Sequence, residues 1–255
     1  MKKYWQLFTD KFGNTILHPQ FIMLSYTKEA EKEIAKNARD KDLIDIGCGR
    51  MPYRKSLESK VKSYVGVDHP KISELYTSDI KPDVFCDITK KIPLKDSSFD
   101  LAIMLEVLEY LENPKKTFSE IYRLLRPNGI LIFTVPFLYP LHDMPYDRNR
   151  YTNTQIKTFL LKSNFEILKL KVQGNFLSFW FQSINVFLFK RIMDIVKQEK
   201  NPLSIIYLLI LLILTPIVVL STNILFLVAR NFEILKYPDY FPLNYLVVGV
   251  KESKN

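Results

Sequence analysis

Short apolar runs alternate with helix-like segments along most of the chain. The apolar runs lie at 43–46, 64–67, 83–86, 100–105, 130–135, 165–172 and 244–250. Segments with the apolar spacing of helices lie at 27–35, 114–125 and 154–162. Short apolar runs of this kind are typical of buried strands, and strands that alternate with helices form β-α-β units. The pattern therefore predicts an α/β fold, with a parallel sheet covered by helices on both faces.

The expected helix ends carry characteristic residues. Thr27 precedes a run rich in Glu, Lys and Ala, so we expect its hydroxyl to cap the first helix. The helix that starts near Pro114 should stop before Pro127-Asn128-Gly129, because proline and glycine interrupt helices. If the loop before residues 154–162 is structural, Thr152 would cap the helix that follows it.

The stretch between the last two expected strands is more apolar than such a sheet needs. Residues 202–229 contain no Asp, Glu, Lys or Arg over 28 positions, which exceeds the roughly 20 residues that cross a bilayer. The basic residues that precede this stretch are Lys190, Arg191, Lys197 and Lys200. We predict three parts: an N-terminal helical segment at 1–42, a sheet domain at 43–173 and 243–255, and a hydrophobic helical insertion at 174–242.

The return of the chain to the sheet limits how this insertion meets a membrane. If residues 175–229 crossed a bilayer as a hairpin, the basic residues would lie outside, against the positive-inside tendency. We expect instead that Thr215-Pro216 and Ser221-Thr222-Asn223 break the apolar stretch. The insertion would then attach a cytoplasmic catalytic domain to the inner face of the membrane, with Trp180 at headgroup level. A true span, and a soluble protein that uses these helices as a lid or dimer interface, are the alternatives.

Glycines after the first expected strand provide a candidate ligand site. Asp45-Ile46-Gly47-Cys48-Gly49 occupies the turn from strand to helix, where glycines let the backbone turn tightly and approach a ligand. A dinucleotide fingerprint would place its third glycine at Pro52, which disfavours a nicotinamide-dependent oxidoreductase. An acidic residue two positions before the first glycine suits a cationic cofactor better than a pyrophosphate.

Acidic residues also follow the next two expected strands. Asp68 lies about 20 residues after the glycines, where a carboxylate can accept hydrogen bonds from ribose hydroxyls. Asp87 follows the third strand, where it would accept a hydrogen bond from an adenine amino group. The carboxyl ends of parallel strands lie along one edge of a sheet, so we expect Asp45, Asp68 and Asp87 to surround one cleft.

Several segments resemble, in order and spacing, the motifs of class I S-adenosylmethionine-dependent methyltransferases. Residues 43–49 resemble the first motif of that family. Residues 92–100 and 106–111 are similar to the segments before and after its fourth strand, and 124–129 to the one before its fifth. The resemblance implies S-adenosylmethionine as cofactor. It also implies a Rossmann-like, mostly parallel seven-stranded sheet, interrupted here by the apolar helical insertion before the last strand.

The same resemblance implies which residues hold the cofactor. They are Asp45, Gly47, Cys48, Gly49, Asp68, Asp87, Ile88 and Glu106. The glycine turn would hold the methionine portion, the carboxylate after the second strand the ribose, and the carboxylate after the third strand, with the next backbone amide, the adenine. Two residues depart from the family pattern. Met51 stands at the usual third glycine, and Tyr110 replaces a common histidine that would be a candidate base.

The loop after the fifth expected strand carries the candidate catalytic residues. A sulfonium is already an activated methyl donor, so orienting the acceptor supplies much of the rate, roughly 7–11 kcal/mol of the barrier. A base is needed when the acceptor is a hydroxyl or a protonated amine. His142 beside Asp143 is the candidate base, and Tyr146 lies in the same loop. The alternative is a structural loop held by a pair between Asp147 and Arg150.

The candidate partners follow from this loop and from the charge of the chain. The loop is similar to one in methyltransferases of surface-polysaccharide pathways, which implies a small or lipid-linked acceptor such as a glycan. The net charge of +9 suits an anionic partner such as an acidic membrane surface. The basic residues are dispersed and no base-flipping motif is present, so we expect no nucleic-acid partner. Cys48 and Cys86 are too few for a disulfide framework or a cysteine zinc site, so we expect no metal. A membrane-bound protein that binds S-adenosylmethionine without turnover is the alternative function, and the oligomeric state is open.

Overall fold

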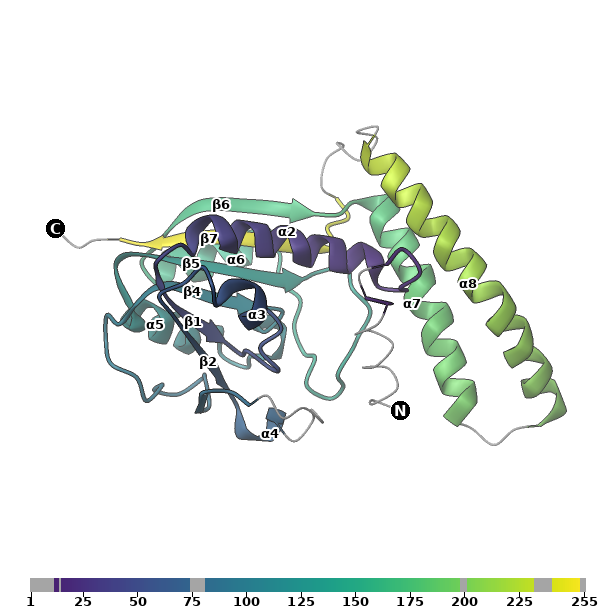
Figure 1. Ribbon diagram of the computed structural model, residues 1–255, viewed down its shortest axis with the longest axis horizontal. Coiled ribbons are helices and arrows are strands. Elements are labelled where there is room, and N and C mark those ends of the chain that lie inside the picture. The colour runs from purple at the N-terminus through teal and green to yellow at the C-terminus, as the bar shows by residue number, and fades with distance from the viewer. Residues whose placement is uncertain (1–11, 14, 74–80, 198–200, 232–239, 253–255) are drawn as a thin grey trace. The chain divides into compact units, whose positions relative to one another are not determined.

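The structure divides into two compact units. It is a computed structural model that describes residues 12–13, 15–73, 81–197, 201–231 and 240–252. The sheet unit comprises Glu29–Phe137, Leu141–Val172 and Asn244–Asn255. The helical unit comprises Met1–Lys28, Leu138–Pro140 and Gln173–Leu243. Figure 1 labels the helices and strands of the two units, and each unit has a buried apolar core of its own.

A seven-stranded sheet forms the centre of the sheet unit. Its strands are β1 (Asp42–Ile46), β2 (Ser63–Asp68), β3 (Val84–Phe85), β4 (Phe99–Leu105), β5 (Leu125–Pro136), β6 (Phe165–Gln173) and β7 (Asn244–Lys251). Their order is β3-β2-β1-β4-β5-β7-β6; β1 to β5 pair in parallel, and β7 is antiparallel to β5. The carboxyl ends of β1 to β5 therefore open on one edge. The predicted Rossmann-like, mostly parallel sheet is confirmed.

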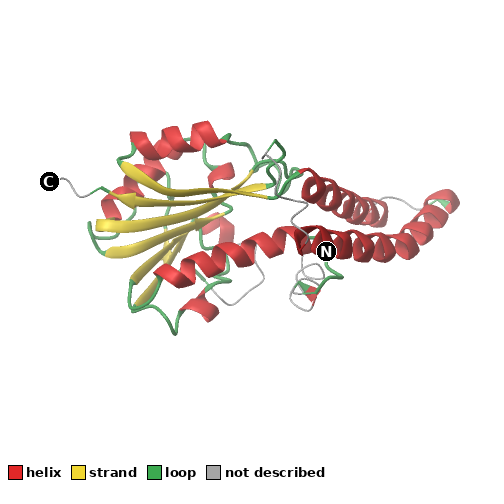
Figure 2. Cartoon of the chain, turned by 90° about the horizontal axis from the view of Figure 1, so that it is seen from above, coloured by secondary structure: helices red, strands yellow, loops and turns green. Residues whose placement is uncertain are grey.

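Helices cover both faces of this sheet (Figure 2). The short elements of the sheet unit are α3 (Arg54–Leu57), α4 (Pro70–Ser73), the 3₁₀ helix η1 (Leu108–Tyr110), α5 (Pro114–Leu124) and α6 (Asn153–Lys162). On one face, fully buried Phe118 of α5 and Ile156 of α6 pack in the larger apolar cluster. On the other, Ile34 of α2 (Phe21–Asn37) and Leu57 of α3 pack in a second cluster. Burial on both faces explains why the strands are apolar at successive positions.

The first described long helix begins earlier than the sequence predicted. α2 starts at Phe21, so Thr27 lies inside the helix and is not its cap. The Thr27 hydroxyl donates to the backbone carbonyl of Met23 at 3.3 Å, a bond that a helix interior provides. The preceding turn is helical because Ile22 and Tyr26, four positions apart, are both buried.

α5 ends at Leu124, before Pro127-Asn128-Gly129, as predicted. These three residues lie inside β5, which begins earlier than the apolar run at 130, and Asn128 has φ +62°. The register between β4 and β5 shifts between Phe99 and Leu101, so the ladder is irregular here. Thr152 caps α6 in a capping box, as the sequence suggested for a structural loop.

Two long helices pack against each other in the helical unit (Figures 1 and 2). They are α7 (Phe176–Lys197) and α8 (Pro202–Asn231). By length and composition α8 is able to cross a membrane, and no other helix among the described residues passes this test. At 30 residues it is about 45 Å long, which exceeds the hydrocarbon thickness of about 30 Å.

The expected interruptions of the apolar stretch are absent. α8 continues through Thr215-Pro216 and Ser221-Thr222-Asn223 as a single helix. The hydroxyl of Ser221 donates to the carbonyl of Ile217 at 2.8 Å. The hydroxyl of Thr222 shares its one proton between the carbonyl of Val218, at 2.9 Å, and the side-chain oxygen of Asn185 on α7, at 2.8 Å. Both hydroxyls have partners in a continuous helix, so they do not end it.

A buried polar cluster fixes which face of α8 meets α7. Asn185 of α7 donates to the side-chain oxygen of Asn223 at 3.1 Å, and Thr222 donates to Asn185 at 2.8 Å. Asn223 also donates to the backbone carbonyl of Ile16 at 2.7 Å. Buried amides need such partners, so this face is held against the rest of the helical unit. Apolar side chains elsewhere on α8 remain exposed.

Candidate functional site

The turn after β1 requires glycine for two reasons. Gly47 and Gly49 have φ of +70° and +53°, in the left-handed region that residues with a Cβ rarely adopt. A Cβ on Gly47 would lie 2.6 Å from a methyl carbon of Val107. The backbone N–H of Gly47 donates to the Val67 carbonyl at 2.8 Å, which continues the pairing of β1 with β2 into the turn. The turn is therefore a preformed part of the sheet edge.

Met51, at the usual third glycine, keeps the conformation of a glycine. Its φ is +50° and its side chain is buried. The Met51 side chain packs against Gly66 of β2. A Cβ added to Gly66 would be 2.6 Å from the Met51 sulfur. The turn thus retains a left-handed residue at this position, and a glycine on the neighbouring strand makes room for its side chain.

Asp68, the last residue of β2, joins that strand to the glycine turn. One carboxylate oxygen accepts the N–H of Gly49 at 2.7 Å, and the other accepts the N–H of His69 at 2.6 Å. The residue is buried, and burial raises the pKa of its carboxyl. A carboxylate oxygen can accept more than one hydrogen bond, so these contacts leave capacity for hydroxyls.

Asp45 lies near the end of β1, and its carboxylate is paired inside the protein. It accepts a hydrogen bond from the hydroxyl of Tyr64 on β2. Burial raises the pKa of Asp45 to about 7, with the Tyr64 hydrogen bond opposing the rise and the charge of Asp68 adding to it. Cys48 in the turn is buried, and burial raises the pKa of its thiol, as do the charges of Asp45 and Asp68. Two neighbouring buried carboxylates of this kind favour a cation beside them.

Asp87 follows β3 by two residues and caps a local turn. Its carboxylate accepts hydrogen bonds from the backbone N–H and the hydroxyl of Thr89, at 3.0 and 2.6 Å, and pairs with Lys90 at 3.4 Å. These contacts lower the pKa of Asp87, with the Thr89 hydroxyl as the largest cause. Ile88 is buried beside it, and its carbonyl accepts the hydroxyl of Thr117.

Glu106 lies directly after β4 in a strained conformation, with φ of +54°. Its carboxylate accepts a hydrogen bond from the side chain of Asn244 in β7 at 2.9 Å. Burial raises the pKa of Glu106 to about 7, and the neighbouring charge of Glu109 adds to this. Non-glycine residues at positive φ persist where the surroundings hold them, often at functional sites.

The loop at 141–150 is held by a dense set of polar contacts. Nδ1 and the backbone N–H of His142 lie 3.1 and 3.0 Å from the same carboxylate oxygen of Asp147. Arg150 donates to both oxygens of Asp147, so the pair expected for a structural loop is present. Asp143, next to His142 in sequence, accepts instead from the hydroxyl of Tyr110 at 3.3 Å, and Tyr146 is exposed.

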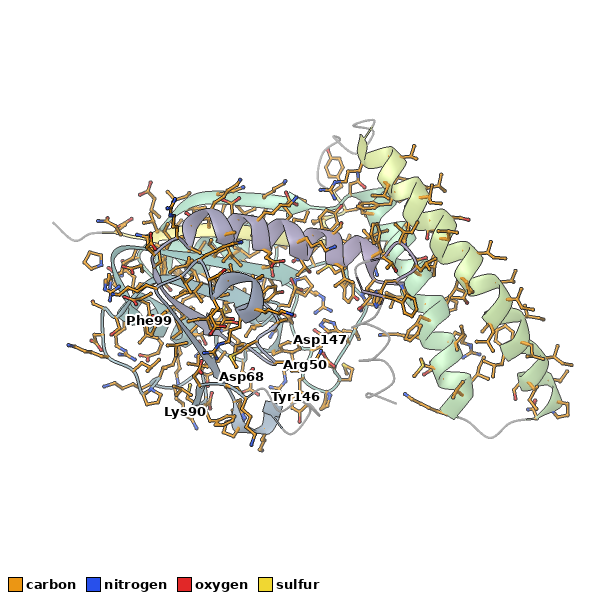
Figure 3. The ribbon with its side chains drawn as sticks, viewed as in Figure 1. Arg50, Asp68, Lys90, Phe99, Tyr146 and Asp147 are labelled. Atoms are coloured by element: carbon orange, nitrogen blue, oxygen red, sulfur yellow. The ribbon has the colours of Figure 1, made fainter. Side chains whose placement is uncertain are left out.

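These residues gather at the carboxyl edge of the sheet. In Figure 3, Asp68, Arg50, Tyr146 and Asp147 lie apart from Phe99. Phe99 begins β4 and so marks the opposite edge of the sheet. The charges of neighbouring strand ends also reach one another. Asp68 and Asp87 both raise the pKa of the Cys86 thiol, after burial, and Glu106 and Asp45 both raise that of the half-buried Tyr53 hydroxyl, also after burial.

Sequence reasoning missed one acidic residue of this region. Glu109 of η1 is fully buried, and its carboxylate lies 3.8 Å from Nε2 of His142. The signal was present, because Glu109 is a charged residue inside the apolar run 107–111. Only the fold shows that the loop carrying His142 lies against it.

Several known proteins are similar to this chain in sequence. Residues 44–133 match a family described as a methyltransferase domain. An uncharacterized protein of Methanocaldococcus jannaschii is 34% identical over 118 residues, 46% of each chain. A Mycolicibacterium smegmatis protein named "Probable S-adenosylmethionine-dependent methyltransferase" is 24% identical over 144 residues, 53% of this chain and 56% of that one. A carboxy-S-adenosyl-L-methionine synthase of Actinobacillus pleuropneumoniae is 25% identical over 214 residues, 71% of this chain and 87% of that one. The match spans about half the length of the first two.

A solved structure agrees in fold. An S-adenosylmethionine-dependent methyltransferase from Mesorhizobium loti superposes with a TM-score of 0.51 at 15% identity, covering 87% of this chain and 97% of that one. The sheet order and the glycine turn are those of a Rossmann-like domain. Residues 44–133 form a methyltransferase domain, and the similar proteins support S-adenosylmethionine as its cofactor. The buried carboxylates of Asp45 and Asp68 suit the positive charge of that cofactor.

Adding one methyl group at Gly66 tests the packing of Met51 against this residue. Gly66→Ala would place a Cβ 2.6 Å from the Met51 sulfur and 2.9 Å from the Cys48 sulfur, so it should destabilise the protein by about 1–3 kcal/mol. Gly249→Ala in β7 is the matched control, since its Cβ would find no atom closer than 3.4 Å. Thermal unfolding should show a melting temperature lower by about 2–4 °C per kcal/mol for the first variant only. Equal melting temperatures would contradict this packing.

Proposed function

We propose that this protein transfers a methyl group from S-adenosylmethionine to a hydroxyl or similar nucleophile of a small or lipid-linked acceptor, at the inner face of a membrane. The observation that carries the enzymatic part is the glycine turn tied to the buried carboxylate of Asp68 by the 2.7 Å bond to Gly49. The turn leaves backbone close to a ligand, and the carboxylate lies where ribose hydroxyls need an acceptor. A lipid-linked glycan is the acceptor class that the loop at 141–150 favours.

The cofactor would lie along the carboxyl ends of β1 to β4. Gly47, Cys48 and Gly49 would approach its methionine portion, with Asp45 behind them supplying negative potential. Asp68 would accept both ribose hydroxyls. The remaining predicted contacts are Asp87 and the backbone of Ile88 to the adenine, and Glu106 to the amino-acid portion. When bound, this cofactor supplies an activated methyl group, so the chain itself has to bind, orient and exclude water.

Acceptor activation is assigned to the loop at 141–150. His142 is the candidate base, and Asp147 holds its Nδ1, which leaves the imidazole in a fixed orientation. Asp143 and Tyr146 are exposed beside it and would contact the acceptor. A positioned base of this kind contributes about 10²–10⁴-fold to the rate when the acceptor is a hydroxyl.

Methyl transfer can be followed with a label. Incubation of the protein and methyl-labelled cofactor with a host lipid extract should move label into the organic phase. His142→Ala should reduce the transfer by about 10²-fold or more while cofactor binding is retained. Label found only in water-soluble acceptors would contradict the proposal of a lipid-linked acceptor. Label confined to a modified cofactor would indicate chemistry on the cofactor, and no transfer with intact binding would indicate a binding protein without turnover.

The membrane part of the proposal comes from the surface of α8. Its apolar side chains are widely exposed, among them Leu203 at 78%, Ile213 at 67% and Ile217 at 58%. A soluble chain seldom exposes so large a contiguous apolar surface. The buried Asn185–Asn223 contact turns the polar face of α8 inward, so the exposed apolar residues are available to lipid.

The basic end of α7 favours an interfacial hairpin over a crossing one. Lys190, Arg191 and Lys197 are exposed near the end of α7 that connects to α8. β6 precedes α7 and β7 follows α8, so both ends of the hairpin return to the same sheet. A crossing hairpin would put these cations on the far side, against the positive-inside tendency. Lying along the inner face, they would meet anionic headgroups, and the sheet unit would be cytoplasmic.

Flotation with vesicles tests this attachment. Wild-type protein should float with phosphatidylcholine vesicles that contain phosphatidylglycerol. The double variant Lys190→Glu, Arg191→Glu should bind about tenfold or more weakly at low salt, because each basic residue contributes about 1 kcal/mol. The matched control is Lys157→Glu, Lys162→Glu, which reverses two exposed lysines of α6. No flotation of the wild type, or equal loss in both variants, would contradict the proposal.

A further inference from the structure

The buried carboxylate of Glu109 has no role in the cofactor site described above. Glu109 is fully buried in η1, and neither of its carboxylate oxygens has a hydrogen-bond partner among the described residues. A carboxylate without donors in such a place is costly unless a proton or a cation compensates it. The surroundings of Glu109 therefore have to supply one.

The loop at 141–150 packs against η1, the helix that carries Glu109. The backbone N–H groups of Arg148 and Asn149 donate to the Glu109 carbonyl, at 3.3 and 3.1 Å, and the Asn149 side chain donates to it at 3.2 Å. These bonds hold the loop against η1. They place Nε2 of His142 3.8 Å from the Glu109 carboxylate, close enough for charge attraction but beyond hydrogen-bond length.

His142 thus lies between two carboxylates on opposite sides of its ring. Asp147 lies 3.1 Å from Nδ1, and its charge is balanced by Arg150, which donates to both of its oxygens. Burial opposes the ionisation of Asp147, but the bond from Arg150 outweighs it and lowers the pKa. Arg150 therefore offsets part of the charge of Asp147, and both Asp147 and Glu109 favour the protonated imidazole.

Two further carboxylates near His142, those of Asp143 and Glu106, act in the same direction. Asp143 from the loop favours the protonated imidazole, and Glu106 interacts with His142 through space. The Tyr110 ring meets the imidazole edge to face, with ring centroids 5.9 Å apart. Burial alone would lower the pKa of His142, but the contact with Glu109 and the charges of Asp147 and Asp143 raise it above its ordinary value.

We infer that Glu109 is a positioning residue that favours the protonated form of His142, and thereby raises the pH above which His142 accepts the acceptor's proton. The inference rests on the proposed function only for its consequence in catalysis. There, the acceptor oxygen gains the methyl group as the methyl–sulfur bond breaks with its electron pair left on sulfur, and the acceptor proton passes to the neutral imidazole. Activity should therefore rise with pH through a value above the ordinary range of histidine.

The first test reads His142 directly and needs no turnover. The chain has three histidines, His18, His69 and His142, so the histidine ring signals of the full-length protein can be assigned by loss in His142→Asn. Titration should place His142 above the ordinary pKa of about 6.5, and Glu109→Gln should lower it by about one pH unit or more. Glu112→Gln is the matched control, since Glu112 is exposed and pairs with Arg148 of the same loop. Glu109→Asp retains the charge and should keep much of the elevation.

The second test separates this inference from the proposed function. In Glu109→Gln, the acid limb of kcat/KM should move to lower pH. The plateau of kcat at high pH should be reduced, because the imidazole is then a weaker base, and KM should be little changed. If methyl transfer occurs and this limb stays where it is in the wild type, the inference fails and the function stands. If no transfer occurs, the titration still decides, and a His142 pKa that is the same in Glu109→Gln as in the wild type overturns the inference. If Glu109→Gln does not fold, an ordinary pKa of His142 in the wild type or in Glu109→Asp overturns the inference.

Discussion

The candidate site depends on one hydrogen bond, from the N–H of Gly49 to the carboxylate of Asp68 at 2.7 Å. It joins the turn after β1 to the end of β2 and so fixes the left-handed conformations of the turn. The same carboxylate is the proposed acceptor for the ribose, which means that the side chain that shapes the turn also binds the ligand. Burial of Asp68 makes both contacts stronger than they would be in water, and makes loss of the carboxylate costly.

Much of the sheet unit could be predicted from the sequence, because its signals are local. Apolar runs between polar residues located the strands to within a few positions, and glycines at Gly47 and Gly49 located the turn. Motif order then supplied the topology, which the seven-stranded sheet confirms. The site residues are placed by strand ends: Asp45 lies near the end of β1, Asp68 ends β2 and Asp87 follows β3, as expected, while their roles remain proposals.

The remaining features depend on contacts between distant parts of the chain. Thr27 looks like a cap, but burial of Ile22 and Tyr26 extends α2 past it. Thr215-Pro216 looks like a break, but α8 continues because its neighbouring hydroxyls bond within the helix and to Asn185. Met51 is accommodated by Gly66 on another strand, and the carboxylate that orients His142 is Asp147 and not its neighbour Asp143. None of these pairings has a local signature.

Calorimetric titration with S-adenosylhomocysteine tests whether the glycine turn and Asp68 bind the cofactor. We expect that the wild type binds this ligand, that NAD produces no comparable heat, and that Asp68→Ala binds about tenfold or more weakly, because hydrogen bonds to a charged group are lost. Asp40→Asn, at a carboxylate that is 89% exposed, should bind like the wild type. The account is contradicted if the folded wild type shows no binding, or if Asp68→Ala and Asp40→Asn bind with the same affinity.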